Sequence, residues 1–589
     1  MTILKIRLSQ LVGTYGIGAI VDAPGRSLMV CESTWRQLRY IDEKRLSRQL
    51  DGRLLCAPMP VVDSGQDDAD VFSGSVPLRI FPRFLHCKKC RKIKDFMAWG
   101  GASVTECRDC DEPLIPSRLV IACTHGHIDD FPWLFWAHSG GNCSKGGTDR
   151  DICIESAGLS TSLRDLHVRC SKCSSSRDLG DCMFPGRLAE LGYARCRGGR
   201  PWASNYPLSE ECSSLPKEIK VLQRSASNVF FCEKQSVLSI PPYSGKAFKA
   251  IEKNRALLEG TSSVGDQFVA QLISKLSVSL RLSVTDLRKA YLSWAKLEDS
   301  SSDDGNIRED EFEVLSSPPV GTNFSEDFHA ISVSNPLPDR PFIKSVTLVH
   351  RLRVVSAQTG FTRIKQGEDG IVPQIINPLS DSAESAWLPA CEVHGEGIFI
   401  QLDAALVNRW LSQVVSDRYD HVLRRAATVS KVLTREKFMP SIPLMALHTF
   451  SHLLMNELSV SSGYSNSAIS ERLYQVLGTD GAVKSLGVLI YTSSSDSEGS
   501  LGGLVRQGDG ARLRELIDKA AASAGWCSND PLCTEVDSVQ GQGADGLNLA
   551  ACHTCALVPE TACELSNCFL DRSLLVGTQG FKGLLVFNG

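Results

Sequence analysis

The chain has 589 residues, of which 42% are hydrophobic and 22% are charged, an ordinary globular composition that excludes a fibrous or wholly disordered chain. The length predicts roughly three to four domains. The formal net charge is −4 at pH 7, so any contact with nucleic acid must come from local basic patches rather than from bulk charge.

Neither a membrane span nor a secretion signal is visible in the sequence. No run of about 18 apolar residues occurs. The N-terminal stretch "MTILKIRLSQLVGTYG" has no long apolar centre and no small-residue cleavage site. We therefore expect a cytoplasmic protein that makes no membrane contact.

The 22 cysteines are the unusual feature of the composition. Thirteen lie between Cys87 and Cys232, six lie between Cys527 and Cys568, and three lie elsewhere. In a reducing cytoplasm, grouped cysteines bind metal more often than they form disulfides. The clustering therefore predicts metal sites, with Zn²⁺ as the expected ion because closed thiolate sites favour zinc.

In chain order, residues 1–80 are expected to form a mixed α/β segment, in which glycine turns separate short strands. Gly16 and Gly18 lack the third glycine and the lysine of a phosphate loop, so a plain turn is the preferred interpretation. Residues 83–240 hold most of the cysteines and are predicted to be a zinc-knuckle or zinc-ribbon region.

Residues 241–297 show helical periodicity, with Ser283 as a candidate N-cap. Residues 298–335 are acidic and rich in serine, which predicts an exposed linker. Residues 340–589 mix strand-like runs ("SVTLVHRLRVV", "GLLVFN") with helical ones ("IPLMALHTFSHLLMNELS") and are predicted to be a C-terminal α/β zinc-binding domain. The predicted fold class is therefore α+β and multidomain.

Two CxxC turns, "CKKC" and "CRDC", are separated by 16 residues in the cysteine-rich region. This spacing is a strong signal for a zinc ribbon or knuckle, because each turn directs two thiolates to one point and two turns complete a tetrahedron. Such a site leaves no position for water and is expected to be structural. The predicted ligands are Cys87, Cys90, Cys107 and Cys110.

The first CxxC turn lies within a basic stretch, "RFLHCKKCRKIKDF", which carries six cations and one acidic residue. A solvated surface is the simplest interpretation of a charge run. A rigid knuckle that displays several cations also suits phosphate groups, although the acidic face of a partner protein would serve equally well. The candidate nucleic-acid-binding residues are Arg83, Lys88, Lys89, Arg91, Lys92 and Lys94.

A second zinc site is expected at the CxxC of Cys170 and Cys173, with Cys196 and Cys212 as the preferred completing pair. Several other residues compete for these positions. They are Cys123, His125, His127, Cys143, Cys153, Cys182 and Cys232.

A third zinc site is expected at the CxxC of Cys552 and Cys555. Crowded thiolates repel one another unless a cation neutralises them, which favours metal over a redox pair. Four nearby thiols compete for the two remaining positions, namely Cys527, Cys533, Cys563 and Cys568.

Catalytic motifs are scarce, since the chain contains no P-loop, no GxSxG elbow and no HExxH. Asp496 and Glu498 follow an apolar strand and could hold Mg²⁺ in a nuclease, with His452 as a further candidate, but a polar loop is the simpler interpretation. His448 and His452 share one helix face and could bind metal. Core histidines are the preferred interpretation there, because the glutamate that a metalloprotease needs is missing.

Eight stretches, in order along nearly the whole chain, resemble a known family. They are "RLSQLVGTYGIGAIVD", "HGHIDDFPW", "QRSASNVFF", "RLRVVSAQTGFTRI", "GEGIFIQLD", "LHTFSHLLMNELSVSSGYSNSAISERLY", "GVLIYTSSSDSEGSLGGLV" and "ACHTCALVPETACELSNCFLDRSLLVG". Together they are similar to the DrmB family of the DISARM anti-phage defence systems. The C-terminal third resembles the zinc-binding (MZB) domain of MrfA-type helicases, here on a chain without a helicase motor.

The resemblance implies a non-enzymatic accessory subunit that pairs with a DrmA-like superfamily-2 helicase, contacts DNA and modulates the motor. ATP hydrolysis would then belong to the partner. A metal-dependent nuclease and a purely protein-binding scaffold are the alternative hypotheses.

The resemblance also bears on the zinc ligands, for which three structural sites are expected. At the C-terminal site it favours Cys552, Cys555 and Cys563, and it promotes Cys533 or Cys527 over Cys568 as the fourth ligand. Of these two, Cys533 is the preferred candidate. At the second site it supports Cys196 together with Cys170, Cys173 and Cys212.

Overall fold

The structure is a computed structural model. It describes residues 6–32, 35, 37–59, 76–156, 158, 162–203, 212–258, 266–299, 307–319, 327–334, 336–364, 387–414, 417–492 and 503–587. No helix within these ranges combines the length and hydrophobicity needed to cross a bilayer.

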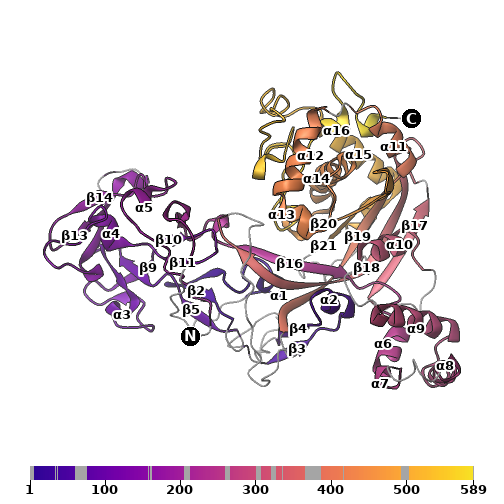
Figure 1. The fold of residues 1–589 in the computed structure, drawn as a ribbon, viewed down its shortest axis with the longest axis horizontal. Coiled ribbons are helices and arrows are strands. Elements are labelled where there is room, and N and C mark those ends of the chain that lie inside the picture. Colours follow the sequence, from indigo (N-terminus) through magenta and orange to yellow (C-terminus); the bar gives the residue numbers. More distant parts are fainter. Residues whose placement is uncertain are drawn as a thin grey trace. The chain divides into compact units, whose positions relative to one another are not determined.

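The chain folds into two compact units, each assembled from separate stretches of sequence (Figure 1). Unit 1 comprises residues 1–42, 52–235 and 356–391. Unit 2 comprises residues 43–51, 236–355 and 392–589. The mixture of several sheets with helices confirms the predicted α+β multidomain class. The stretches of the two units alternate along the chain, whereas the sequence analysis divides the chain into consecutive segments. The boundaries of those segments stay predictions.

Unit 1 begins with short strands joined by tight turns, as its glycine-rich sequence predicts. After the short helix α1 (Leu8–Leu11), β1 (Ile20–Ala23) and β2 (Arg26–Val30) form a hairpin, and β5 (Leu78–Ile80) adds to β2. In the hairpin turn, Gly25 has a φ of 73°, a conformation that glycine adopts without steric cost. β3 (Leu38–Tyr40) pairs with β4 (Leu54–Pro58), and β4 also pairs in parallel with the start of β19 (Trp387–Leu402).

The cysteine-rich region of unit 1 is built on a seven-stranded antiparallel sheet with the order β14-β13-β12-β7-β6-β9-β8. A second, three-stranded sheet has the order β11-β10-β15. The CxxC turns lie at strand ends, so the hydrogen bonds of the sheet hold the turns in place. The strands are β6 (Phe84–Cys87), β7 (Lys92–Asp95), β8 (Glu106–Cys107), β9 (Glu112–Pro116), β10 (Leu119–Ala122), β11 (Ile128–Asp130), β12 (Ile152–Ser156), β13 (Leu166–Cys170), β14 (Ser176–Asp178) and β15 (Lys220–Gln223). Short helices connect them, namely α3 (Phe96–Trp99), α4 (Trp133–Ala137) and α5 (Arg187–Glu190).

Four of the stretches that carry the family resemblance meet around Arg363 in the core of unit 1. The Arg363 guanidinium is fully buried and donates to the carbonyl oxygens of Gly18 (2.8 Å), Gly126 (2.9 Å) and Val229 (2.5 Å). Gly18 has a φ of 90°, and a Cβ there would lie 2.5 Å from the Phe361 ring. Gly18 is therefore required for close packing in a turn, and Arg363 satisfies backbone groups that burial would otherwise leave unpaired.

Unit 2 contains a sheet whose strands follow the order β18-β19-β21-β20, with β17 paired to β18 and β16 next to β18 (Figure 1). β18 and β19 are long and continue into the residues of unit 1. The run "SVTLVHRLRVV" lies in β18, as predicted. The strands are β16 (Phe231–Leu238), β17 (Phe328–Ser334), β18 (Ile343–Thr362), β19 (Trp387–Leu402), β20 (Ile469–Leu477) and β21 (Val483–Thr492).

The central helix of unit 2, α14 (Ile442–Ser462), contacts β20 and β21 and is buried over most of its length. The Ser441 side chain caps its N-terminus by accepting from the Leu444 amide, and Gly463 ends it with a φ of 79°. The surrounding core extends from Leu337 to Phe587. The other helices of this part are α11 (Ala404–Leu411), α12 (Asp417–Val429), α13 (Lys431–Arg435), α15 (Gly510–Ala524) and α16 (Ser573–Val576).

The predicted helical segment forms α6 (Lys246–Lys253), α7 (Arg255–Leu258), α8 (Asp266–Leu280) and α9 (Val284–Asp299). The Ser283 side chain accepts from the Asp286 amide at 3.0 Å, which confirms it as the N-cap of α9. These helices share their own small hydrophobic core.

Part of the predicted linker is instead structured. Residues 307–316 form α10 (Ile307–Ser316), in which Glu311 is fully buried and Phe312 and Leu315 pack inward. The acidic composition was misleading because Glu311 pairs with Arg472 at 2.6 Å and accepts from the Leu238 amide at 2.9 Å. The charge is thus satisfied inside the protein.

The strand predicted for "GLLVFN" is also wrong, because Leu584–Val586 form a 3₁₀ turn. Leu584, Leu585 and Phe587 are all buried. A short apolar run that is buried on every side carries no periodicity to distinguish a strand from a turn.

Candidate metal centres

All 22 cysteines are free thiols, and 15 of them belong to five clusters with metal-binding geometry. In each cluster, one candidate ligand atom from each of four residues lies within 4.8 Å of the others. A zinc–sulfur bond of about 2.3 Å in a tetrahedron places two sulfurs about 3.8 Å apart, whereas a disulfide would bring them to about 2 Å. The separations described below match the first value, so these residues fit zinc.

Site 1 consists of Cys87, Cys90, Cys107 and Cys110, as the sequence predicts. The Sγ atoms of Cys90 and Cys107 lie 3.8 Å apart. The residue after each CxxC is in the left-handed conformation, with φ of 63° at Arg91 and 52° at Asp111. Each amide donates to the carbonyl of the first cysteine, at 2.8 Å in both turns. The two knuckles are therefore built alike and present four sulfurs to one point.

The basic stretch around site 1 is more neutralised than its sequence suggests. Arg83 pairs with Asp95 at 2.7 Å, Lys88 with Glu112 at 2.9 Å and Lys92 with Asp109 at 3.2 Å. Two of these acidic partners come from the second knuckle and its flanking strand, so the linear stretch conceals them.

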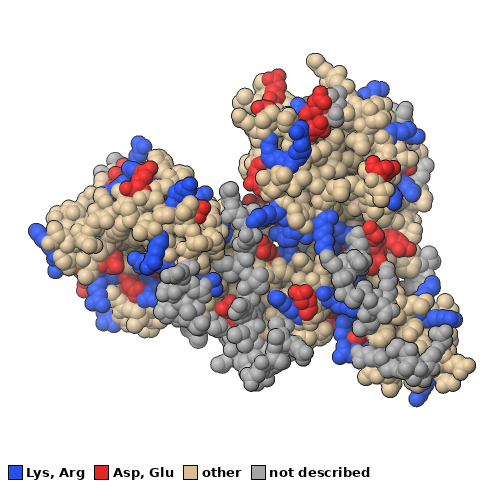
Figure 2. Space-filling view, viewed as in Figure 1, with Lys and Arg blue, Asp and Glu red and all other residues tan. Residues whose placement is uncertain are grey.

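Three of the six candidate cations around site 1 are not part of these ion pairs. Lys94 lies 4.7 Å from the centroid of the Trp99 ring. Lys89 and Arg91 are exposed, and no ion pair is found for either within the described ranges. Figure 2 shows basic and acidic side chains interspersed on the visible face. Lys89 and Arg91 are thus the freest of the six predicted contacts for a phosphate group.

The predicted second site is wrong as a group of four, because the structure divides its residues between two clusters. Cys170 and Cys173 lie with His138 and Cys143, which we call site 3. Cys196 and Cys212 lie with Cys123 and His127, which we call site 2. The prediction assigned two cysteine pairs, Cys170 with Cys173 and Cys196 with Cys212, to one ion. The fold does not bring these two pairs together.

Site 2 uses a CxxxH turn in place of a CxxC turn. Cys123 Sγ lies 3.5 Å from His127 Nδ1 and 3.9 Å from Cys212 Sγ. Gly126, with a φ of 76°, makes the turn, and its amide donates to the Cys123 carbonyl. The neighbouring Cys196 thiol is the main cause that lowers the pKa of Cys123 to about 3, so the cluster favours a thiolate at Cys123. His125 stays outside, with its Nδ1 2.5 Å from Ser214 Oγ.

Site 3 contains a histidine that the sequence did not single out. His138 Nε2 lies 3.1 Å from Cys173 Sγ, while its Nδ1 lies 2.7 Å from the carbonyl oxygen of Leu134. Cys143 Sγ lies 3.8 Å from Cys170 Sγ. The Ser175 side chain is the main cause that lowers the pKa of Cys173 to about 6. The only signal for His138 was its place five residues before Cys143.

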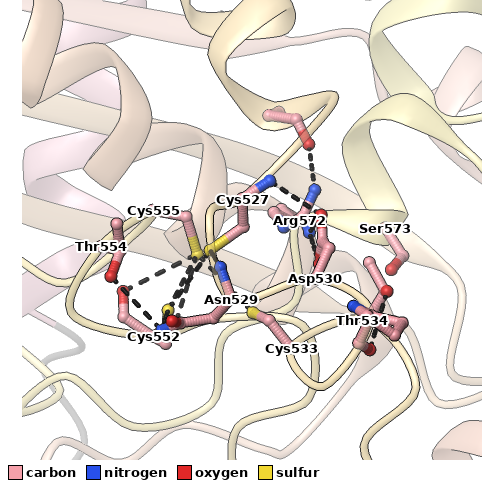
Figure 3. Close-up of polar contacts among 12 residues, drawn as sticks. Cys527, Asn529, Asp530, Cys533, Thr534, Cys552, Thr554, Cys555, Arg572 and Ser573 are labelled. Atoms are coloured by element: carbon pink, nitrogen blue, oxygen red, sulfur yellow. Dashed lines mark hydrogen bonds and ion pairs between the residues drawn. The ribbon is translucent and has the colours of Figure 1, made fainter.

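Site 4 combines Cys552 and Cys555 with Cys527 and Cys533 (Figure 3). Sγ–Sγ separations are 3.5 Å for Cys527 and Cys552, 3.7 Å for Cys552 and Cys555, and 3.9 Å for Cys533 and Cys555. Cys533 is therefore in the cluster as predicted, and Cys527 takes the place predicted for Cys563. The "WCSNDPLC" loop supplies both upstream thiols, which the distance in sequence had left ambiguous.

Polar contacts hold the upstream loop of site 4 in position (Figure 3). Asp530 accepts from the Cys527 amide at 2.7 Å, and Arg572 donates to both Asp530 oxygens at 2.6 and 2.7 Å. Burial raises the pKa of Asp530, but the Arg572 side chain and the Cys527 amide outweigh it and hold that pKa below its usual value. An ionised Asp530 thus fixes the loop next to the sulfurs.

The two remaining C-terminal cysteines lie elsewhere. Cys568 is buried, and its thiol donates to the carbonyl oxygen of Leu565 at 2.8 Å. Cys563 lies with His448, 3.2 Å from its Nε2, rather than with site 4. The other candidate carboxylates, Asp496 and Glu498, lie outside the described residues.

Comparison with known families agrees with a zinc-binding protein. Residues 450–556 match the model of the MrfA Zn-binding domain, MZB, and residues 7–231 match a domain of unknown function, DUF8724. The fold and the thiol clusters therefore define a multidomain protein with a C-terminal zinc-binding MZB region.

A close relative gives the family. The DISARM protein DrmB of Bacillus paralicheniformis is 31% identical over 542 residues, which cover 87% of this chain and 91% of the relative. The chain belongs to the DrmB family of DISARM proteins, as the resemblance predicts.

The solved structures with a match include the DUF1998 helicase MrfA bound to DNA. The match covers 37% of this chain and 23% of that chain, with 13% sequence identity and a TM-score of 0.17. A similarity this low supports no conclusion about the present chain.

Proposed function

We propose that the chain is a non-catalytic, zinc-stabilised accessory subunit of a cytoplasmic DISARM anti-phage complex, which pairs with a DrmA-like superfamily-2 helicase. The observation that carries the proposal is the closed form of sites 1 to 4. Each offers four protein ligands to one ion, so none leaves a coordination position for water or substrate. Such sites stabilise architecture and do not perform hydrolysis.

A helicase partner is favoured by the C-terminal domain. The family model matched there is the MrfA Zn-binding domain, and the C-terminal stretches resemble the zinc-binding domain of MrfA-type helicases. The present chain has no P-loop in its sequence. We infer that ATP hydrolysis belongs to the partner and that the MZB-bearing region, proposed to span residues 340–589, contributes binding rather than a motor. The continuous core from Leu337 to Phe587 supports that extent.

We propose that the complex meets DNA in part through the knuckle of site 1. Lys89 and Arg91 are exposed and rigidly held by the left-handed turn, so they can approach a phosphate without breaking an ion pair. Lys88 and Lys92 would first have to leave Glu112 and Asp109. A phosphate contact through Lys89 and Arg91 would therefore cost less free energy than one through Lys88 and Lys92.

Co-expression with the helicase of the same defence locus tests the partnership. We expect the two chains to elute together in size-exclusion chromatography and DNA-stimulated ATPase activity to differ between the pair and the helicase alone. Separate elution at micromolar concentration would contradict the proposal. The isolated chain should leave DNA intact with Mg²⁺ or Mn²⁺, and cleavage by it would instead revive the nuclease hypothesis.

Salt dependence separates DNA contact from a purely protein-binding scaffold. A Lys89→Glu, Arg91→Glu variant of the pair should bind DNA more weakly and show a shallower decrease of affinity with salt, since each lost phosphate contact lowers the slope by about 1. The matched control is Lys88→Ala, because Lys88 is already paired with Glu112. Unchanged DNA affinity together with lost helicase binding would favour the scaffold.

A further inference from the structure

The strongest feature outside sites 1 to 4 is a fully enclosed cluster of four different ligand types in unit 2. It consists of His448, His452, Glu471 and Cys563, whose candidate ligand atoms all lie within 4.8 Å of one another. The exposed fraction is 0% for both histidines, 3% for Glu471 and 9% for Cys563. The two histidines come from α14, the glutamate from β20 and the cysteine from the C-terminal loop. We propose that this cluster is a further structural metal site that binds one Zn²⁺ ion.

The ring orientation of both histidines favours metal ligation. His448 Nδ1 lies 3.2 Å from the Phe569 carbonyl oxygen, and His452 Nδ1 lies 2.9 Å from the Ala556 carbonyl oxygen. A carbonyl can only accept, so each Nδ1 carries the proton and each Nε2 keeps its lone pair. Both Nε2 atoms face Glu471, and this arrangement is the one by which proteins orient metal-binding imidazoles.

The distances fit one tetrahedral ion. His448 Nε2 lies 3.2 Å from Cys563 Sγ and 3.1 Å from Glu471 Oε1, and His452 Nε2 lies 3.4 Å from the same oxygen. Bonds of about 2.0–2.3 Å to zinc place nitrogen, oxygen and sulfur ligands about 3.3–3.6 Å apart. Backbone amides hold two of the ligand atoms in place. The Asn567 amide donates to Cys563 Sγ and the Glu564 amide donates to Glu471 Oε1, each at 3.1 Å.

Protein contacts alone leave the cluster incomplete. His452 Nε2 and Glu471 Oε2 are buried and have no hydrogen-bond partner among the described residues. Unsatisfied buried polar atoms of this kind are rare in folded proteins. A cation at this point would bind the lone pair of His452 Nε2 and neutralise the Glu471 carboxylate.

Charge points to a divalent ion. A thiolate and a carboxylate carry two negative charges, which one Zn²⁺ neutralises in a region closed to water. Without the ion, a buried carboxylate would rely on one protonated histidine, and the second histidine would stay unpaired. Mixed nitrogen, oxygen and sulfur ligands suit zinc, and four protein ligands leave no position for a reaction. The site would then join α14, β20 and the loop that follows site 4.

Metal content of variants tests the proposal with the full-length chain. His452→Gln and Glu471→Gln should each bind one zinc fewer than the wild type in native mass spectrometry after loading with excess zinc. The matched control is His421→Gln, an exposed histidine of α12, which should keep the wild-type count. Folded His452→Gln and Glu471→Gln chains with the wild-type count would overturn the proposal.

A second measurement covers variants that fail to fold. The wild-type chain loaded with ¹¹³Cd should give one NMR resonance well upfield of those from sites 1 to 4, because that ion would have one sulfur ligand rather than three or four. Resonances confined to the sulfur-rich range at full loading would overturn the proposal and leave a proton shared by His448 and Glu471 as the explanation of the cluster.

Discussion

His138 Nε2 lies 3.1 Å from Cys173 Sγ, and its Nδ1 is held 2.7 Å from the carbonyl oxygen of Leu134. The carbonyl fixes the tautomer, so the lone pair of Nε2 faces the thiols of site 3. His138, which belongs to no CxxC motif, therefore completes the four ligands of site 3.

The His138→Ala substitution should remove one zinc ion from the full-length chain, because site 3 would keep only three ligands. Native mass spectrometry measures the loss. His125→Ala is the control, since His125 lies beside site 2 but hydrogen bonds to Ser214 instead of completing the cluster. Equal zinc counts in the two variants would show that His138 is not a ligand.

Site 3 also constrains a glycine. A Cβ at Gly147 would lie 2.8 Å from Cys143 Sγ and 3.0 Å from Cys170 Sγ, so Gly147→Ala should displace the thiolates and weaken zinc binding at site 3. Competition with a chelator measures the change as faster zinc release. Gly146→Ala controls for backbone strain, because Gly146 has a φ of 64° but its Cβ would meet open space. The interpretation fails if Gly146→Ala releases zinc as fast as Gly147→Ala.

Site 4 distinguishes two cysteines that the sequence could not. Cys527→Ala should lose one zinc ion, because its sulfur lies 3.5 Å from that of Cys552. Cys568→Ala should keep all of them, because its thiol donates to the Leu565 carbonyl in the core. Cys527→Ala should also be the less stable variant, since structural zinc contributes on the order of 10 kcal/mol to local folding. Zinc loss in Cys568→Ala alone would reverse the assignment.

The buried pair of Glu311 and Arg472 predicts a stability change in unit 2. Glu311→Gln removes the nearer of two acidic partners of Arg472, leaves only Glu564 at 3.6 Å, and should destabilise unit 2 by about 3 kcal/mol. Urea denaturation monitored by fluorescence measures this effect. Glu313→Gln, an exposed position of α10, should change stability little. A similar small change at Glu311 would mean that the pair contributes nothing.

The sequence predicts the local knuckles well and the long-range pairings poorly. Cys87 and Cys90 with Cys107 and Cys110 follow from spacing alone, because each CxxC turn fixes its own geometry and the two turns lie on adjacent hairpins of one sheet. Cys170 and Cys196 gave no such information. The residues that complete their clusters, His138 with Cys143 and Cys123 with His127, lie well before them in the sequence. Only the fold of the seven-stranded and three-stranded sheets determines which of these groups meet.

Polar residues in the core were the other source of error. Glu311 reads as part of an acidic linker, and the sequence analysis did not single out Glu471, because composition does not reveal a buried partner. Arg472 supplies the partner of Glu311 from 161 residues away, and His448 supplies that of Glu471 from a different element, α14. Periodic helices such as α9 and α14 were predictable because their signals, a serine cap and an apolar repeat, are local.

The zinc content of the purified full-length chain tests the central claim most directly, since the account depends on the cysteine clusters being metal sites. Native mass spectrometry should find four zinc ions at sites 1 to 4 and a fifth at His448, His452, Glu471 and Cys563. Mass spectrometry of the denatured chain should give the mass of the fully reduced protein, because each disulfide would lower that mass by two hydrogens. A folded chain with fewer than four zinc ions, or with disulfides among the clustered cysteines, would contradict the account.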